Sequence, residues 1–176
     1  VETKAYGKML IIDDFVMLTE ADEFVYHEMI SHVPIYFHKN PERVLIIGGG
    51  DGGTVREVAK YSCVKKITLC EIDSMVVEVS QKYFPDLTKS LDDPRVNVKI
   101  GDGVAYVESL TQEYDLIIID STDPIGPGEG LFTQNFYSHV ARALRPGGMM
   151  VAQTESPWYD KKMLQKIYQN ISKNFS

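Results

Sequence analysis

Cysteine is scarce in this sequence, whose 176 residues include only Cys63 and Cys70. Two cysteines do not form the disulfide framework of a small secreted protein, so we expect free thiols in a reducing compartment. Long apolar runs are also missing. The longest stretches, 44–47 and 116–119, have strand length, whereas a membrane span needs about 20 apolar residues. The opening residues VETKAYGKML lack a signal-peptide pattern. These absences predict a cytoplasmic protein.

Basic residues are outnumbered, because 18 Lys and Arg face 25 Asp and Glu, which gives a net charge of −7 and a pI near 5.1. An acidic chain has no general attraction for nucleic acid or for anionic membranes, so both are excluded as expected partners. Any partner chosen by charge would be a cation. The 44% hydrophobic and 24% charged residues are ordinary for a folded, globular protein.

A metal-binding pattern is also missing. The four histidines, His27, His32, His38 and His139, show no metal-type spacing with the cysteines. We therefore expect no metal cofactor.

The chain opens with a predicted hairpin, in which strands 8–12 and 15–18 flank a turn at Asp13 and Asp14. Thr19 is then the expected N-cap of a helix over 22–32, which Pro34 should end. Two strands alone are marginally stable. The hairpin must therefore pair with further strands or pack on the rest of the chain.

From residue 43 onward, apolar strands alternate with helical segments, which predicts an α/β domain with a parallel sheet and helices on both faces. Ser121–Leu131, rich in Pro and Gly, is a candidate lid. The expected strands are 44–47, 66–70, 96–100, 116–119 and 149–153, and the expected helices are 53–61, 74–84, 103–110, 133–144 and 161–173.

The turn after the first of these strands carries G-x-G-x-x-G, as Gly48, Gly50 and Gly53. An acidic residue, Glu71, follows 18 positions after the last glycine, at the end of the next strand. Ligands of open parallel sheets bind beyond the carboxyl ends of the strands, and an acid at this spacing binds ribose hydroxyls. The pattern predicts a nucleoside site.

Other carboxylates follow the strand ends too, namely Asp51, Asp102, Asp120 and Asp123. A carboxylate in the glycine turn would repel a phosphate 4 Å away by about 4 kcal/mol and would attract a cation comparably. Each acid alone could be a turn former or a helix cap. Together they favour a cationic nucleoside with a cationic amine and disfavour the pyrophosphate of NAD.

With these residues in view, the sequence resembles the polyamine aminopropyltransferases, most closely their spermidine synthases. The resemblance rests on LTEADEFVYHEM, VLIIGGGDGGTVREV, CEID, GDG and DSTDPIGPGEGLF, in chain order. It implies a Rossmann-like, class I methyltransferase fold over 19–176, with 1–18 as the remnant of a small N-terminal β-domain. It also implies that the C-terminal part of the family's chain is missing. The family precedent is a homodimer or a homotetramer.

The resemblance also implies how decarboxylated S-adenosylmethionine, the co-substrate, would be held. Asp51 would bind its aminopropyl ammonium, Glu71 its ribose, and Asp102 with Gly103 its adenine. Met17 stands where the family usually has Gln, a departure that replaces a hydrogen-bonding side chain by a thioether.

For the acceptor, the resemblance implies that Asp120 takes a proton from the attacking amine of putrescine. The diamine channel would be lined by Tyr26, His27, Asp123 and Gln153, although His27 could equally be an ordinary helix-face histidine. The products would be spermidine and methylthioadenosine. The alternatives are an S-adenosylmethionine-dependent amine N-methyltransferase, a nicotinamide dehydrogenase, which Asp51 opposes, and a non-catalytic nucleoside-binding subunit.

Overall fold

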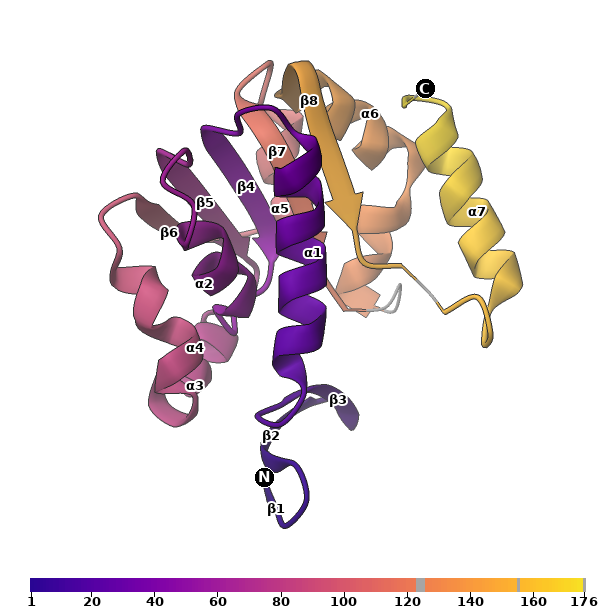
Figure 1. Cartoon of the computed structure of the whole chain (residues 1–176). Helices are drawn as coiled ribbons and strands as arrows, with labels where there is room; N and C mark the ends of the chain where they lie inside the picture. The colour runs from indigo at the N-terminus through magenta and orange to yellow at the C-terminus, as the bar shows by residue number, and fades with distance from the viewer. Residues whose placement is uncertain (123–125, 155, 176) are drawn as a thin grey trace.

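Five of the apolar segments form one parallel sheet, seen in the computed structural model of the chain (Figure 1). The structure describes residues 1–122, 126–154 and 156–175. The strand order is β6-β5-β4-β7-β8, and every neighbouring pair is parallel. The strands are β4 (Arg43–Gly48), β5 (Lys66–Glu71), β6 (Val96–Ile100), β7 (Tyr114–Asp120) and β8 (Leu144–Ala152). The predicted α/β fold is confirmed.

Helices cover both faces of the sheet (Figure 1). Along β4, Val44 and Ile46 join the core that contains α1, α2 and α3, while Leu45 and Ile47 join the core beneath α5, α6 and α7. Burial of each such side chain contributes about 1.5–3 kcal/mol, so both faces hold the sheet. The helices are α1 (Glu23–Phe37), α2 (Gly53–Ala59), α3 (Ser74–Tyr83), α5 (Gly103–Glu108), α6 (Gln134–Ala143) and α7 (Lys161–Ser172).

Short segments complete the connections. A four-residue helix, α4 (Pro85–Thr88), and a 3₁₀ turn, η1 (Lys89–Asp92), follow α3, and a second 3₁₀ segment, η2 (Gly126–Phe132), precedes α6. The predicted lid lies partly in η2 and partly outside the described residues.

The N-terminal strands form a separate, antiparallel sheet of β1 (Glu2–Thr3), β2 (Gly7–Ile12) and β3 (Phe15–Thr19). Leu10 and Leu18 pack against Phe84 and Leu87 beside α3. The predicted hairpin is confirmed, and Leu10 and Leu18 are its side chains buried on the larger domain.

Two expectations about α1 were wrong. Thr19 does not cap the helix: the N-cap is Asp22, and the Thr19 hydroxyl donates to the Asp22 carboxylate at 2.6 Å. The helix also continues through Pro34 to Phe37. A proline inside a helix removes one hydrogen bond and crowds the carbonyl four residues earlier. The burial of Pro34 and Ile35 offsets this cost and holds the last turn against the sheet.

Strand β8 begins at Leu144 rather than at Met149. The sequence Arg145–Gly148 resembles a turn, and Gly147 indeed has a φ of +82°. An irregularity in the register between Tyr114 and Leu116 of β7 accommodates this segment within the paired strand.

Cys63 and Cys70 are both free, as expected. Among the described residues, no helix has the length and apolar character needed to cross a bilayer.

Candidate functional site

A cavity of about 540 Å³ opens at the carboxyl edge of the sheet, between the strand ends and the N-terminal hairpin. Its apolar walls include Leu10, Ile47 and Leu131. Most of the residues predicted from the sequence line it: Met17, Tyr26, His27, Gly48, Gly50, Asp51, Glu71, Asp102, Gly103, Asp120 and Gln153. Gly53 lies behind the wall, and Asp123 lies outside the described residues.

Gly48 makes the sharp exit from β4 that brings the glycine turn under the cavity. Its φ is +79°, and a Cβ there would lie 2.0 Å from the backbone oxygen of Asp120. A side chain is therefore excluded by both backbone conformation and space. This close approach sets the glycine turn directly against the end of β7.

Asp120 ends β7, and each of its carboxylate oxygens accepts a short hydrogen bond. The Tyr26 hydroxyl donates to Oδ1 and the Thr54 hydroxyl donates to Oδ2, both at 2.6 Å. Burial, and next the negative charge of Asp51, raise the pKa of Asp120. A carboxylate with a raised pKa is a better proton acceptor near neutral pH.

Asp51 is paired with a histidine, which the sequence reasoning did not foresee. The His27 Nε2 lies 3.2 Å from Oδ1 of Asp51, and the Gly53 N–H donates to the same oxygen at 2.7 Å. Burial alone would raise the pKa of Asp51, but the hydrogen bond and charge of His27 outweigh it, so the pKa is lowered. Asp51 is therefore ionised. It also accepts the first N–H of α2, that of Gly53, although the N-cap position is occupied by Gly52 rather than by Asp51.

His27 is almost fully buried, with 2% of its side chain exposed, so it is not an ordinary helix-face histidine. Its Nδ1 lies 2.6 Å from Oε2 of Glu23, one turn earlier on α1. Arg56 of α2 in turn donates two hydrogen bonds of 2.9 Å to Glu23. Burial opposes protonation of His27, yet the carboxylates of Asp51, Asp120 and Glu23 raise its pKa to about 9.

Glu71 lies at the end of β5 beside the glycine turn. Its Oε2 accepts the Gly50 N–H and its Oε1 accepts the Asp73 N–H, both at 3.0 Å. A Cβ at Gly50 would lie 2.8 Å from the Glu71 carboxylate, so this approach requires glycine. Burial raises the pKa of Glu71, and the two backbone donors oppose that shift.

Asp102 follows β6 and is the N-cap of α5, where it accepts the Val104 N–H at 2.8 Å. The cap interpretation is thus correct, and the side chain lines the cavity as well. At Gly103, a Cβ would lie 2.4 Å from Ile47. That glycine lets α5 begin directly against the end of β4.

Tyr26 connects the two sides of the cavity. Besides Asp120, its hydroxyl lies 3.2 Å from Oε1 of Gln153, which follows β8. Burial, then the charge and hydrogen bond of Asp120, raise the pKa of Tyr26, so its hydroxyl stays a donor. Met17 of β3 lines the same space and packs with the hairpin core.

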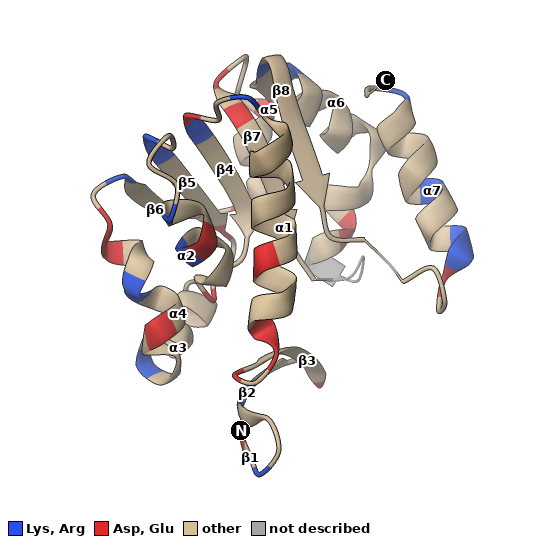
Figure 2. Cartoon of the chain, in the orientation of Figure 1, with Lys and Arg blue, Asp and Glu red and all other residues tan. Residues whose placement is uncertain are grey.

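Charges of both signs lie at the amino edge of the sheet, whereas the strand ends at the cavity carry carboxylates (Figure 2). Arg43 and Lys66 begin β4 and β5 at the amino edge. Asp120 and Glu71 end β7 and β5 at the opposite edge, on the cavity. Arg56, a cation near the cavity, forms ion pairs with Glu23 and Glu57. The arrangement suits a cationic ligand.

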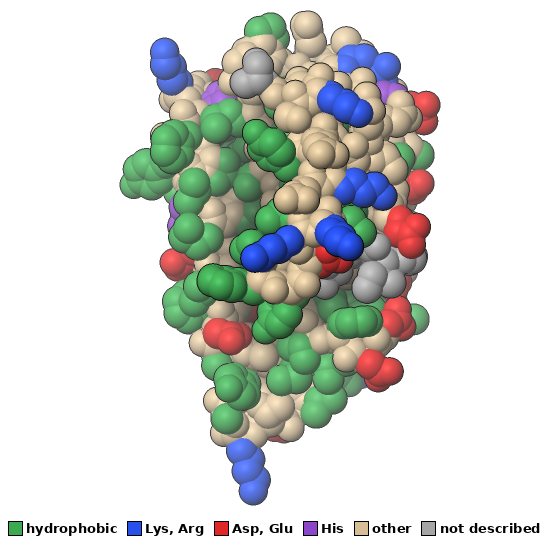
Figure 3. Space-filling model, turned by 90° about the vertical axis from the view of Figure 1, so that its right-hand side faces the viewer, with side chains coloured by type: hydrophobic (Ala, Val, Ile, Leu, Met, Phe, Trp, Pro, Cys, Tyr) green, Lys and Arg blue, Asp and Glu red, His purple; other side chains and the backbone are tan. Residues whose placement is uncertain are grey.

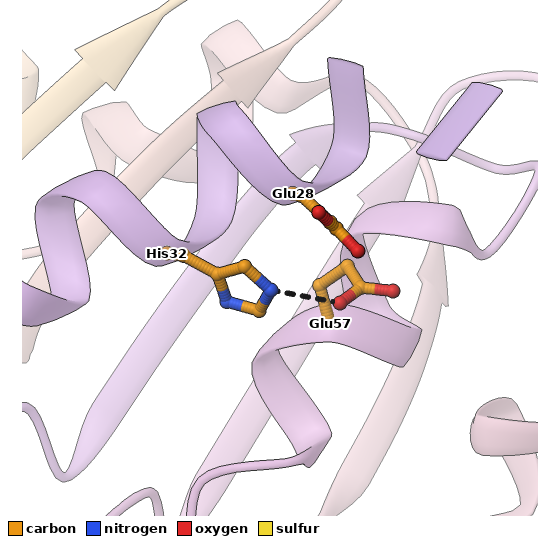
Figure 4. A group of neighbouring side chains, drawn as sticks. All are labelled: Glu28, His32 and Glu57. Atoms are coloured by element: carbon orange, nitrogen blue, oxygen red, sulfur yellow. Dashed lines mark ion pairs between the residues drawn. The ribbon is translucent and has the colours of Figure 1, made fainter. Parts of the chain in front are cut away.

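A second cluster, Glu28, His32 and Glu57, lies outside the cavity and joins α1 to α2 (Figure 4). The spacing of histidines and cysteines in the sequence does not reveal this cluster, because two of its members are glutamates. Its three possible ligand atoms lie within 4.8 Å of one another. Glu57 already accepts from Arg56 at 2.8 Å and from Lys60, and the His32 Nε2 lies 3.0 Å from its carboxylate. Since two side-chain cations already neutralise this carboxylate, we interpret the cluster as an ion-pair network.

Sequence reasoning missed Thr54, Glu23 and Arg56 as members of the site. Thr54 follows the glycine turn directly, and Glu23 precedes His27 by one helical turn. These spacings were the available signals, because residues four apart on a helix face each other.

Comparison with known proteins places the chain among close relatives. A family model described as "Spermine/spermidine synthase domain" matches residues 23–176. A polyamine aminopropyltransferase of Bacillus mycoides is 50% identical over 175 residues, which cover 99% of this chain and 64% of that protein. One from Thermoanaerobacter sp. is 53% identical over 166 residues, 94% of this chain and 60% of that protein. The chain spans about three fifths of these relatives' length.

Solved structures agree. A spermidine synthase in complex with the transition state analogue AdoDATO superposes with a TM-score of 0.96 at 47% identity, over 99% of this chain and 60% of that one. The spermidine synthase from Thermotoga maritima gives 0.92 at 45% identity, over 99% and 58%. The carboxylate-lined cavity, the family match and these likenesses agree, and the chain belongs to the spermine/spermidine synthase family.

Proposed function

We propose that the protein transfers the aminopropyl group of decarboxylated S-adenosylmethionine to putrescine, giving spermidine and methylthioadenosine. The observation that carries this proposal is the meeting of Asp51, Glu71 and Asp120 at one cavity, which the glycine turn also lines. The family relatives named above support it.

For the nucleoside, we assign the ribose hydroxyls to Glu71 and the adenine to Asp102 and Gly103. The aminopropyl ammonium belongs beside Asp51, which is ionised at neutral pH because His27 lowers its pKa. Met17 and the glycines at 48, 50 and 53 shape this part of the site. A nucleoside with a carboxylate at that position would be repelled by Asp51.

For the acceptor, Tyr26, Gln153 and Asp120 lie together and would line the diamine channel with Asp123. His27 was expected to touch the diamine. Because both of its ring nitrogens face carboxylates, we assign it instead a supporting place behind Asp51.

The reaction would be an in-line displacement. The lone pair of a neutral putrescine amine attacks the methylene carbon bonded to the sulfonium. The carbon–sulfur bond breaks, its electrons stay on sulfur, and methylthioadenosine leaves as a neutral thioether. The amine nitrogen gives up a proton, which Asp120 accepts, directly or through water. A positioned base of this kind contributes typically 10²–10⁴-fold.

The proposal is tested by mass spectrometry of products after incubation with putrescine and either decarboxylated or intact S-adenosylmethionine. We expect spermidine from the decarboxylated form and no methylated amine from the intact form. Methyl transfer would favour the amine N-methyltransferase, and nucleoside binding without any product would favour a non-catalytic subunit.

Asp120→Asn should lower turnover by about 10²–10⁴-fold, because the amide cannot accept the amine proton. The affinity for methylthioadenosine should stay within about threefold, since the nucleoside contacts are elsewhere. The matched control is Asp86→Asn, which removes an exposed carboxylate from α4. Near-normal turnover of the Asp120 variant would remove this residue from the mechanism.

We also propose that residues 1–18 belong to a small β-domain and 19–176 to the catalytic domain, which the two separate sheets support. A homodimer or a homotetramer is supported by large apolar side chains that α1 leaves exposed, among them Phe24, Met29 and Phe37. Hydrophobic side chains gather along that side of the molecule (Figure 3). The two free thiols support a cytoplasmic location.

A further inference from the structure

Four charged side chains form a chain that starts at the cavity wall, in which His27 is buried and the other three are partly buried. Arg56 donates to both oxygens of Glu23 at 2.9 Å, and Glu23 Oε2 lies 2.6 Å from His27 Nδ1. The His27 Nε2 then lies 3.2 Å from Asp51. Charges alternate along this chain, so each group is stabilised by its neighbours. We call these four residues the His27 relay.

The His27 relay lies next to two carboxylates that share one cavity. Asp51 and Asp120 both line it, and two carboxylates in one poorly solvated space do not ionise independently. One of the two then holds a proton more tightly than it would alone. The proposed function needs a division of tasks, in which one carboxylate stays charged and the other accepts a proton.

Geometry gives the two carboxylates different partners. Asp51 faces a cation, His27, and a backbone N–H, whereas Asp120 accepts only from the neutral hydroxyls of Tyr26 and Thr54 among the described residues. A cationic donor stabilises a carboxylate more strongly than a neutral hydroxyl does.

We propose that His27, held by Glu23 and Arg56, is a positioning residue that keeps the negative charge on Asp51 and leaves Asp120 as the carboxylate that accepts the proton. This inference rests on the proposed function for the tasks of the two acids. Pairs of titratable groups whose environments separate their proton affinities are typical of acid–base sites.

The direction of each pKa agrees with this division. Burial raises the pKa of Asp120 and the charge of Asp51 raises it further, while the charge of His27 and the hydrogen bonds of Thr54 and Tyr26 oppose the shift without reversing it. Burial would do the same to Asp51, but His27 reverses the shift. The charged groups that face His27 are Glu23 on its own helix, Asp51 in the glycine turn and Asp120 on β7.

The packing encloses the His27 ring. The ring lies where a Cβ on Gly53 would come within 2.3 Å of it, and only 2% of the side chain is exposed. Both ring nitrogens of this enclosed histidine face carboxylates. His27 therefore influences a bound ligand through the charge that it stabilises on Asp51.

His27→Gln tests the inference, because glutamine keeps hydrogen-bonding groups but has no charge. We would titrate this variant and the wild type with decarboxylated S-adenosylmethionine and with methylthioadenosine, which lacks the ammonium, between pH 5 and 8. We expect the variant to lose about tenfold affinity for the ammonium-bearing nucleoside at the acid end of this range, because without the charge of His27 the burial of Asp51 raises its pKa. The loss should diminish towards pH 8, and methylthioadenosine binding should stay within about twofold.

Matched variants separate positioning from packing. Glu23→Gln should also lower the affinity for decarboxylated S-adenosylmethionine at acid pH, by a smaller factor. His32→Gln, on the same helix but in the cluster of Figure 4 outside the cavity, should leave it unchanged. If His27→Gln does not fold, Glu23→Gln carries the test. The proposal would be overturned if the His27 variant lost the same affinity for both nucleosides. It would also be overturned if the His27 and Glu23 variants kept the wild-type affinity for decarboxylated S-adenosylmethionine at acid pH.

A ligand-free readout keeps this inference distinct from the proposed function. In the wild type, ¹⁵N NMR of the His27 ring should show protons on both nitrogens at pH 7.5, and a neutral ring there would overturn the inference. A protonated ring in a protein that transfers no aminopropyl group would count against the proposed function alone.

Discussion

Gly53 shows how a single missing side chain makes room for a functional one. A Cβ at this position would lie 2.3–2.5 Å from three atoms of the His27 ring. Gly53→Ala should therefore push the ring away from Asp51 and lower the free energy of unfolding by about 1–3 kcal/mol, the usual cost of overpacking. Urea unfolding monitored by circular dichroism measures the change.

Gly101→Ala is the matched control, because a Cβ there would meet no atom within 4 Å. It should change the free energy of unfolding by no more than about 0.5 kcal/mol. Equal stability of the two variants would mean that the His27 ring can move at little cost.

The residues at the strand ends were predictable, but their partners were not. Glu71 and Asp120 follow apolar strands directly, so parallel topology alone brings them to one edge. His27 comes from a helix before the sheet begins, and nothing in local sequence says that its ring will lie against Asp51. Pairing of this kind depends on where α1 crosses the sheet, which is a tertiary feature.

Asp115 connects three strands at the amino edge of the sheet. Its Oδ2 accepts the N–H groups of Glu42 and Arg43 at 3.0 and 2.8 Å, ahead of and within β4, and Arg145 of β8 lies 3.3 Å from Oδ1. Asp115→Ala should lower the free energy of unfolding by about 2 kcal/mol, because it leaves two partly buried N–H groups without an acceptor. Urea unfolding measures this loss.

Glu113→Ala is the control for this edge. Its carboxylate lies 3.6 Å from Arg43 and is 42% exposed, so its removal should cost less than about 0.5 kcal/mol. If both variants lose the same stability, the backbone bonds to Asp115 do not hold the strands together.

Element boundaries were harder to predict than element types. The alternation of strands and helices follows from the apolar periodicity and is confirmed. The end of α1 at Pro34 and the start of β8 at Met149 were wrong, because packing of Ile35 and pairing with Tyr114 extend both elements. Such extension depends on contacts with other elements and leaves no local pattern.

Burial of a charged histidine should also make the stability of the whole molecule depend on pH. The pKa of His27 is 6.5 when unfolded and about 9 when folded, so the native state binds the proton more tightly. Its contribution, about 3 kcal/mol, is fully present below pH 6.5 and is lost as the pH rises through 9. Urea unfolding at a series of pH values should show this decline.

The decline should be absent in His27→Gln and retained in His32→Gln. A wild-type protein whose stability is constant between pH 6.5 and 9 would contradict a protonated His27 in the native state.

The proposed function requires that negative side chains select a positively charged nucleoside. The most direct test compares the affinities of the wild type and Asp51→Asn for decarboxylated and for intact S-adenosylmethionine, measured by calorimetry. The wild type should prefer the decarboxylated form by at least about tenfold, and the variant should bind the two forms within about threefold of each other. Equal binding of both forms by the wild type, or an unchanged preference in the variant, would contradict the account.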